Sequence, residues 1–264
     1  MPALSSPCAS PTDPARETTL TPAEALPARL RFDRLDALRA IAIGWMAVFH
    51  LFFDLDHFGF ITQSFRSDPF WTTQRTAIVS LFLFCAGVGQ AIALEQRQPW
   101  SRFWRRWAQV AGCALLVTLG SLWMFPRSFI TFGVLHCIAL GLIVMRLSGG
   151  AGRWLWLLGL AAVLLPWLVQ HPFFDARATQ WIGLVTRKPR TEDFVPLLPW
   201  LGAMWWGLAS GQWVLARRRG WLAGTLPASL QSLARLGRWS LSFYMLHQPV
   251  LIGLLMLVAK AKQE

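Results

Sequence analysis

Charged residues are scarce in this chain of 264 residues: they make up only 14% of it, and a soluble domain of this size carries nearly twice that fraction. Acidic residues are the scarcer sign, with 13 Asp and Glu against 25 Lys and Arg, which gives a net charge of +12. The basic residues stand in short clusters between apolar runs, as in positive-inside loops and unlike a surface that follows nucleic-acid phosphates. Hydrophobic residues make up 55% and the mean hydropathy is +0.42. The composition therefore predicts a membrane protein with no nucleic-acid partner.

Several common sequence signals are also missing. The four cysteines form no CxxC pair and no metal-ligand spacing, so we expect neither a metal site nor a disulfide framework. There is no glycine-rich phosphate loop, no heptad pattern and no internal repeat. Residues 1–30 are rich in Pro, Ala, Ser and Thr and lack the apolar core of a secretory signal peptide. We expect this segment to be a disordered cytoplasmic tail, followed by one transmembrane domain over residues 31–264.

What the sequence does contain is a set of seven apolar runs, each long enough to cross a membrane at about 20 residues. The expected spans are Ala37–Leu55, Thr76–Leu94, Arg106–Met124, Phe129–Leu147, Trp154–Val169, Val195–Leu215 and Trp239–Val258. Gly87 and Gly89 in the second run offer close helix contact. We therefore predict an all-α, polytopic membrane helix bundle of about seven transmembrane helices.

The distribution of Lys and Arg favours a cytoplasmic N-terminus. With this orientation the cytoplasmic segments hold 15 of these residues, leaving aside Arg16 in the tail, and the opposite side holds 9. The longest connection between spans, residues 170–194, then lies outside, and loops of this length are often functional.

The first span carries the most informative polar residues. Arg39 and His50 are eleven residues apart, which is three helical turns plus roughly 20°, so both lie on one helix face about 16 Å apart along the axis. Asp54 follows His50 by four residues on nearly the same face. Ionisable side chains inside an apolar span are costly and indicate a functional site.

Each of these residues also has a structural interpretation. Asp54 can orient the His50 imidazole for general-base chemistry, or the two can form a simple hydrogen bond on the helix surface, and His57 competes as a partner of Asp54. Asp36 fits the N-cap of the first helix. Arg39 is either a membrane anchor or a contact for an anion such as a cofactor phosphate.

Further candidates lie in other runs. Arg102, Arg105 and Arg106, interleaved with aromatic residues, form a basic collar that fits lipid headgroups or phosphates. His136 lies midway in the fourth run, and Asp193 fits a cap at the end of the outer loop. In the last run Tyr244, His247 and Gln248 share one face, as a polar site or as part of a helix kinked at Pro249.

These motifs resemble a known family. LDALR followed by ten residues and His50 is similar to the first span of membrane acyltransferases of the O-antigen acetylase type. The full order is closer to bacterial relatives of heparan-α-glucosaminide N-acetyltransferase. It comprises an Asp-x-x-Arg at Asp36–Arg39, Phe84–Gly87, FGVLHCIAL, DFVPLLPWLG and GRWSLSFYMLHQPVL. The resemblance extends from about Arg34 to Leu251.

The resemblance implies transfer of an acetyl group from cytoplasmic acetyl-CoA to an amine or hydroxyl of a sugar on the far side of the membrane. The family arginine corresponds to Arg39, and the first-span histidine of the acetylase type corresponds to His50; in the glucosaminide enzymes the reactive histidine lies slightly later, near His57. Arg39 and the collar would hold CoA phosphates. His50 would act as base or form an acyl-His intermediate, and His136, Tyr244 or His247 would donate to the oxyanion.

We thus expect an acetyl-CoA-dependent acyltransferase without a metal, in the bacterial inner membrane. Its expected partners are membrane lipid, acetyl-CoA and an envelope sugar, with a homodimer left open. Two other functions compete with this one. A transporter would use the same polar stripe as a substrate or proton path, and would favour broken helices and an internal repeat. A non-catalytic partner of an envelope complex would tolerate loss of His50.

Overall fold

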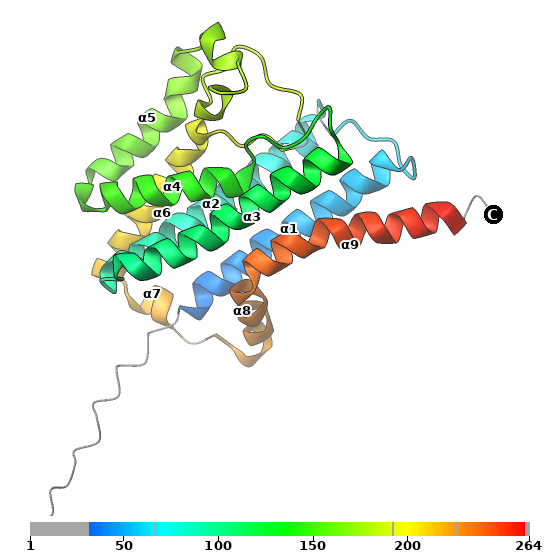
Figure 1. The fold of residues 1–264 in the computed structure, drawn as a ribbon. Helices are drawn as coiled ribbons and strands as arrows, with labels where there is room; N and C mark the ends of the chain where they lie inside the picture. The colour runs from blue at the N-terminus through cyan, green and yellow to red at the C-terminus, as the bar shows by residue number, and fades with distance from the viewer. Residues whose placement is uncertain (1–31, 66, 192, 225, 262–264) are drawn as a thin grey trace, which may run out of the picture. The chain divides into compact units, whose positions relative to one another are not determined.

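The structure, a computed structural model, describes residues 32–65, 67–191, 193–224 and 226–261, so the expected tail at 1–30 lies outside it. The described residues form helices and, apart from an isolated bridge between Phe132 and Phe194, contain no β-structure (Figure 1). The α-helices are α1 (Asp33–His57), α2 (Pro69–Glu95), α3 (Trp100–Met124), α4 (Val134–Ser148), α5 (Trp154–Leu168), α6 (Leu197–Arg217), α7 (Gly220–Ala223), α8 (Gln231–Arg238) and α9 (Ser240–Ala261). Short 3₁₀ helices occupy Gly149–Ala151, Pro172–Asp175, Gln180–Ile182 and Ala228–Leu230. The all-α prediction is confirmed.

Glycines set the closest helix packing, which joins α2 to α6. A Cβ atom at Gly87 would overlap the Met204 carbonyl oxygen, and one at Gly207 would overlap the Phe84 carbonyl oxygen. The two backbones therefore touch, as small residues allow in membrane bundles. The predicted close contact at Gly87 is confirmed, whereas Gly89 lies against the side chain of Arg39 in α1.

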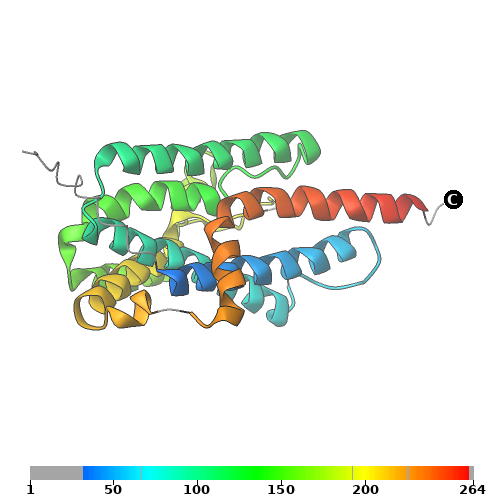
Figure 2. The same cartoon turned by 90° about the horizontal axis from the view of Figure 1, so that it is seen from below.

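Helices α1, α8 and α9 bring the two ends of the domain together. α1 packs against α2, α8 and α9, and Figure 2 shows α8 lying across α1. The crossing is tight because Gly237 rests on the backbone of α1 at Asp36, where a Cβ would overlap the Asp36 carbonyl oxygen. α9 then follows from the end of α8 and runs beside α1, which places the last helix of the domain next to the first.

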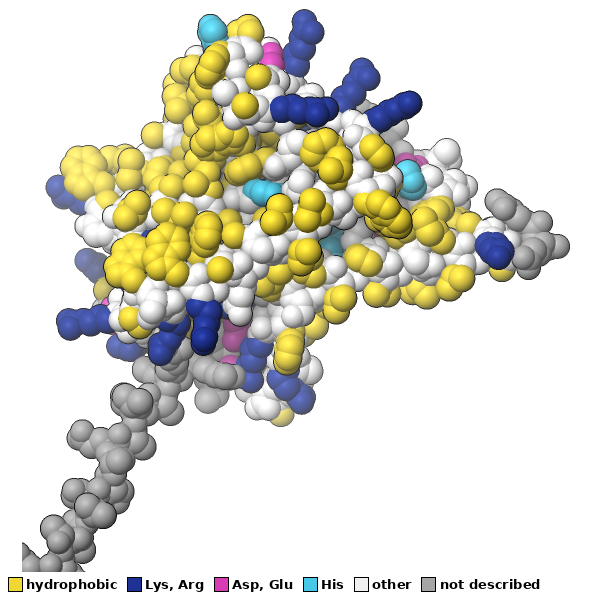
Figure 3. Space-filling model, viewed as in Figure 1, with side chains coloured by type: hydrophobic (Ala, Val, Ile, Leu, Met, Phe, Trp, Pro, Cys, Tyr) yellow, Lys and Arg dark blue, Asp and Glu magenta, His cyan; other side chains and the backbone are white. Residues whose placement is uncertain are grey.

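Within the part of the chain that the structure describes, five helices are long and apolar enough to cross a membrane: α1, α2, α3, α4 with its 3₁₀ extension to Ala151, and α9. Each of the seven expected spans contains an α-helix, but α4 begins only at Val134, α5 has only 15 residues and α6 is not in this set. Figure 3 shows hydrophobic side chains over the helices of one face, with Lys and Arg mainly at its two ends. The chain is a multi-pass membrane protein, and seven crossings with a cytoplasmic N-terminus stay predictions.

The long connection between α5 and α6 is folded against the bundle. Gln180 is buried and donates from Nε2 to Thr131 Oγ1 at 2.8 Å, which ties this connection to the segment before α4. Within the connection, Asp175 accepts hydrogen bonds from the hydroxyl and the N–H of Thr186 at 2.5 and 2.8 Å. The connection is therefore held in place at the ends of α3 and α4.

Candidate active site

The structure pairs two histidines from opposite ends of the chain. His50 on α1 and His247 on α9 have ring centroids 5.0 Å apart, with His50 Nδ1 3.4 Å from His247 Nε2. Both side chains are half-buried between their helices. His50 therefore faces protein rather than surrounding lipid.

Backbone carbonyls determine which nitrogens of the pair carry protons. His50 Nδ1 lies 3.0 Å from the Met46 carbonyl oxygen, and His247 Nδ1 lies 2.6 Å from the Tyr244 carbonyl oxygen. A carbonyl oxygen only accepts, so each neutral imidazole carries its proton on Nδ1 and a lone pair on Nε2. His247 Nε2 then accepts from His50. His50 Nε2 has no hydrogen-bond partner among the described residues, which leaves it able to take a proton or to attack an electrophile.

Asp54 has a different partner from the one that its spacing to His50 suggests. Its side chain is 3% exposed and accepts from Gln248 Nε2 at 2.9 Å and 3.2 Å through its two oxygens. The predicted alignment of both residues on one face of α1 is present, but the hydrogen bond of Asp54 goes to α9. A fixed carboxylate thus lies one turn from His50 and contributes negative charge beside the pair.

The two remaining candidates on α1 and α9 have distinct surroundings. His57 is the last residue of α1, is exposed, and contacts the rings of Phe58 and Phe125. Tyr244 stacks on Phe82 of α2 at 6.3 Å between centroids, and its ring also lies 5.6 Å from that of His247. Tyr244 thus belongs with the histidine pair, whereas His57 lies at the rim.

Arg39 lies in an ionic cluster at the opposite end of α1. Its guanidinium is 2.8 Å from the Asp36 carboxylate and rests on α2 at Gly89, where a side chain would leave no room for it. Arg238 of α8 adds contacts of 2.9 Å to Asp33 and 3.9 Å to Asp36. The N-cap expectation for Asp36 is wrong, because α1 begins at Asp33 and Asp36 is used in ion pairs within the first turn.

The basic collar lies at the start of α3. Arg102, Arg105 and Arg106 are exposed there, and Arg106 is in Coulombic range of Arg39 and Asp36. The collar and Arg39 thus lie at one end of the bundle, and an anion bound there would meet several cations. This end of the bundle is at the start of α1, whereas the histidine pair lies toward the C-terminal end of α1.

His136 belongs to another polar group. Its Nε2 is 3.2 Å from Thr118 Oγ1, and its Nδ1 accepts from the N–H of Gly133 at 3.3 Å, which caps α4. Asp193 accepts from the Val134 N–H at 2.9 Å and so caps α4, whereas α6, which follows the outer loop, has no side-chain cap; the capping role is present but at a different helix from the one expected. Burial raises the pKa of the Asp193 carboxyl, and the Arg75 guanidinium opposes this shift.

Arg75 is the residue that the sequence did not single out. Its guanidinium donates to the Phe194 carbonyl oxygen at 3.3 Å, and it lies in Coulombic range of both Asp193 and His50. Its position near the start of an apolar run made it look like an ordinary flanking cation. Because α2 packs against α1 and against the connection before α6, Arg75 lies beside the site.

The fold is a helical bundle whose apolar helices are long enough to span a membrane. Between its first and last helices lies a paired-histidine site. These features define a multi-pass membrane protein with a polar centre. Comparison with protein families gives the particular family. The chain belongs to the family described as heparan-alpha-glucosaminide N-acetyltransferase, catalytic, whose model matches residues 31–249 and so includes both histidines of the pair. This confirms the resemblance noted from the motifs and places the protein among membrane acetyltransferases. Searches of curated proteins and of solved structures gave no match.

Proposed function

We propose that this protein transfers the acetyl group of cytoplasmic acetyl-CoA to an amine or hydroxyl of a sugar on the other side of the membrane. The observation that carries the proposal is the His50–His247 pair, in which His50 presents an unshared Nε2 lone pair inside the bundle. A neutral imidazole in this position suits general-base chemistry on an acceptor group. The family membership favours this function over a transporter.

In this proposal the two ends of α1 have different roles: one binds CoA and the other carries the base. Arg39 and the collar of Arg102, Arg105 and Arg106 form a cationic end that suits the phosphates of CoA. His50 lies about 16 Å farther along the same helix, a distance that an extended pantetheine arm spans. In this proposal the N-terminus lies on the cytoplasmic side, and the protein lies in the bacterial inner membrane.

At the acetyl group, His50 Nε2 takes the proton of the acceptor N–H or O–H while the acceptor atom forms a bond to the acetyl carbon. The carbon–sulfur bond breaks, and the departing thiolate takes the proton back from His50, which restores the neutral imidazole. His50 is positively charged in between, and it keeps donating from Nδ1 to Met46 and His247. The Asp54 carboxylate, held by Gln248, favours that charge from one turn away. We assign the Tyr244 hydroxyl to the developing oxyanion.

The test uses purified protein in proteoliposomes with radiolabelled acetyl-CoA and a mixture of amino sugars. Wild-type protein should label an acceptor, and His50→Ala should lose at least about 100-fold in transfer rate while keeping acetyl-CoA binding. His171→Ala is the matched control, since His171 is exposed in the connection after α5 and caps only a 3₁₀ turn there. Full transfer by His50→Ala, with loss in His57→Ala, would move the base to His57. Absence of any acetyl-CoA binding by wild type would overturn the proposal.

A further inference from the structure

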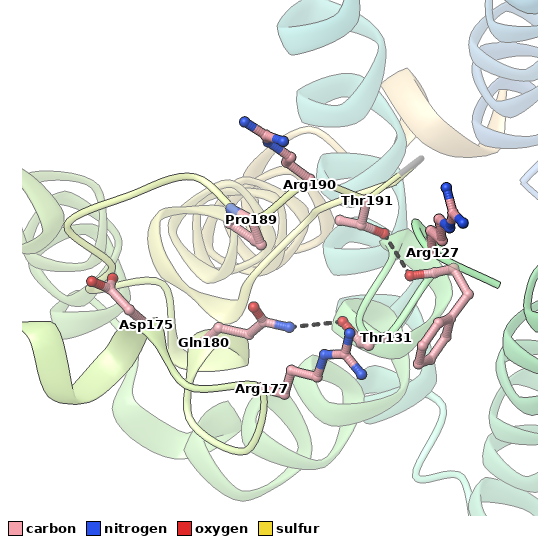
Figure 4. Close-up of a pocket in the computed structure, with 9 residues that line it drawn as sticks. Arg127, Thr131, Asp175, Arg177, Gln180, Pro189, Arg190 and Thr191 are labelled. Atoms are coloured by element: carbon pink, nitrogen blue, oxygen red, sulfur yellow. Dashed lines mark hydrogen bonds between the residues drawn. The ribbon is translucent and has the colours of Figure 1, made fainter. Parts of the chain in front are cut away.

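The connection after α5 and the segment before α4 enclose a cavity that the transfer reaction does not use. This cavity, the arginine pocket, has a volume of about 290 Å³ and is lined by Arg127, Arg177 and Arg190 together with Asp175, Thr131 and Gln180. Figure 4 shows the three guanidiniums spaced around it, with the hydrogen bond from Gln180 to Thr131 between them. It lies at the end of the bundle where α1 and α3 end and α4 begins.

Among the described residues that line the arginine pocket, positive charges outnumber negative ones. Among the described residues, Arg127, Arg177 and Arg190 have no carboxylate in ion-pair contact. The one acidic residue of the lining, Asp175, is already engaged by Thr186, whose hydroxyl and N–H hold the pKa of its carboxyl below the ordinary range. Arg177 is positioned by the Phe129 ring, 5.4 Å from its guanidinium carbon. Three exposed arginines around one small cavity give it a positive charge that is complementary to an anion such as a phosphate.

An apolar groove lies directly beside this pocket. It has a volume of about 390 Å³ and runs between α3 and α4, where Trp107, Ala111, Ala139 and Ile143 line it and His136 faces it. Trp107 closes one wall by donating to the Ala139 carbonyl oxygen at 2.9 Å. α3 crosses the membrane with apolar residues exposed along it, so this groove opens toward lipid chains.

The pocket and the groove are adjacent. Thr131 and Gln180 line the pocket, and their sequence neighbours Phe132 and Trp181 line the groove. The hydrogen bond between Gln180 and Thr131 and the contact between the rings of Phe132 and Trp181, with centroids 6.0 Å apart, lie along their common border. A cationic cavity next to an apolar groove matches a molecule with an anionic head and a hydrocarbon chain.

We propose that this face binds one lipid-linked phosphate, with the phosphate among Arg127, Arg177 and Arg190 and the chain in the groove between α3 and α4. Lipid binding at this face uses no residue of the proposed acetyl-transfer site and is measured separately from acetyl transfer. The net negative charge of the phosphate head group selects the ligand over a zwitterionic lipid, and the groove adds affinity in proportion to the apolar surface that the chain buries.

The test is native mass spectrometry of full-length protein from nanodiscs that contain equal amounts of phosphatidylglycerol and phosphatidylcholine. Wild type should retain one phosphatidylglycerol in preference to phosphatidylcholine. The triple variant R127Q/R177Q/R190Q should lose this preference by about tenfold or more, because each charge-assisted contact to phosphate is strong. R187Q is the matched control: it removes an exposed arginine of the same connection that does not line the pocket.

Two further arms separate a lipid from a free phosphate. Ala111→Trp fills the groove and should weaken phosphatidylglycerol retention while leaving the arginines intact. Glycerol phosphate, which has the head without the chain, should compete only at much higher concentration than the lipid. Equal competition by glycerol phosphate, or unchanged lipid retention in the triple variant, would overturn the proposal. Thermal unfolding of each variant beside wild type ensures that a loss of lipid is not a loss of fold.

Discussion

The contact between α2 and α6 gives a quantitative prediction about stability. In Gly207→Ala the new methyl group would overlap the Phe84 carbonyl oxygen, an atom of the facing backbone that has no rotamer to move into. Overpacking typically costs 1–3 kcal/mol, and a rigid neighbour places this substitution near the upper end. For a chain of this length, about 3 kcal/mol corresponds to a decrease in Tm of about 6–12 °C.

The matched control is Gly120→Ala on α3, where a Cβ would have nothing within 4 Å. Because alanine is the better helix former, this variant should keep or slightly raise the Tm. Both variants are measured in the same detergent by thermal unfolding, followed through tryptophan fluorescence at one heating rate. If the two alanine variants unfold at the same temperature, the reasoning from backbone contact between α2 and α6 is refuted.

Three further predictions concern polar groups. Arg39→Ala should raise KM for acetyl-CoA about tenfold or more with a smaller change in kcat; an unchanged KM in steady-state transfer assays would exclude a phosphate contact. Asp54→Ala leaves Gln248 Nε2 buried without its acceptor and should lower the free energy of unfolding by about 1–3 kcal/mol, measured by thermal unfolding. Replacing both Asp54 and Gln248 with leucine should recover much of this stability. Equal losses of stability in the single and the double variant would contradict the prediction. The pKa of Asp175 is lowered in the folded state, so its charge stabilises the loop at pH values above 3.8, the ordinary pKa of the group. This contribution is lost as the pH falls through the folded-state pKa. Proteolysis of the loop should therefore increase at acidic pH, and Asp175→Asn should show the increase at pH 7.

Helix positions were predictable from the sequence because apolar runs of the right length are a local property. The shared face of Arg39, His50 and Asp54 was also predictable, since it follows from helical spacing alone. The same holds for the grouping of Tyr244, His247 and Gln248 on α9. Each of these predictions concerns residues within one helix.

The pairing between helices was not predictable in this way. Spacing suggested that Asp54 forms a hydrogen bond with His50. Because α9 packs against α1, Asp54 instead accepts from Gln248, and His50 pairs with His247. Arg75 looked like a flanking cation until the packing of α2 placed it near His50 and Asp193. Such partners depend on which helices become neighbours, which no single stretch of sequence encodes.

The distance along the chain between the two imidazoles has a consequence for biogenesis. They are separated by 197 positions, so the ribosome synthesises His50 long before His247. A nascent protein therefore holds an incomplete centre throughout most of its synthesis. The two imidazoles can meet only after α9 has been synthesised and packs against α1, so the proposed centre requires the last helix of the domain to be in place.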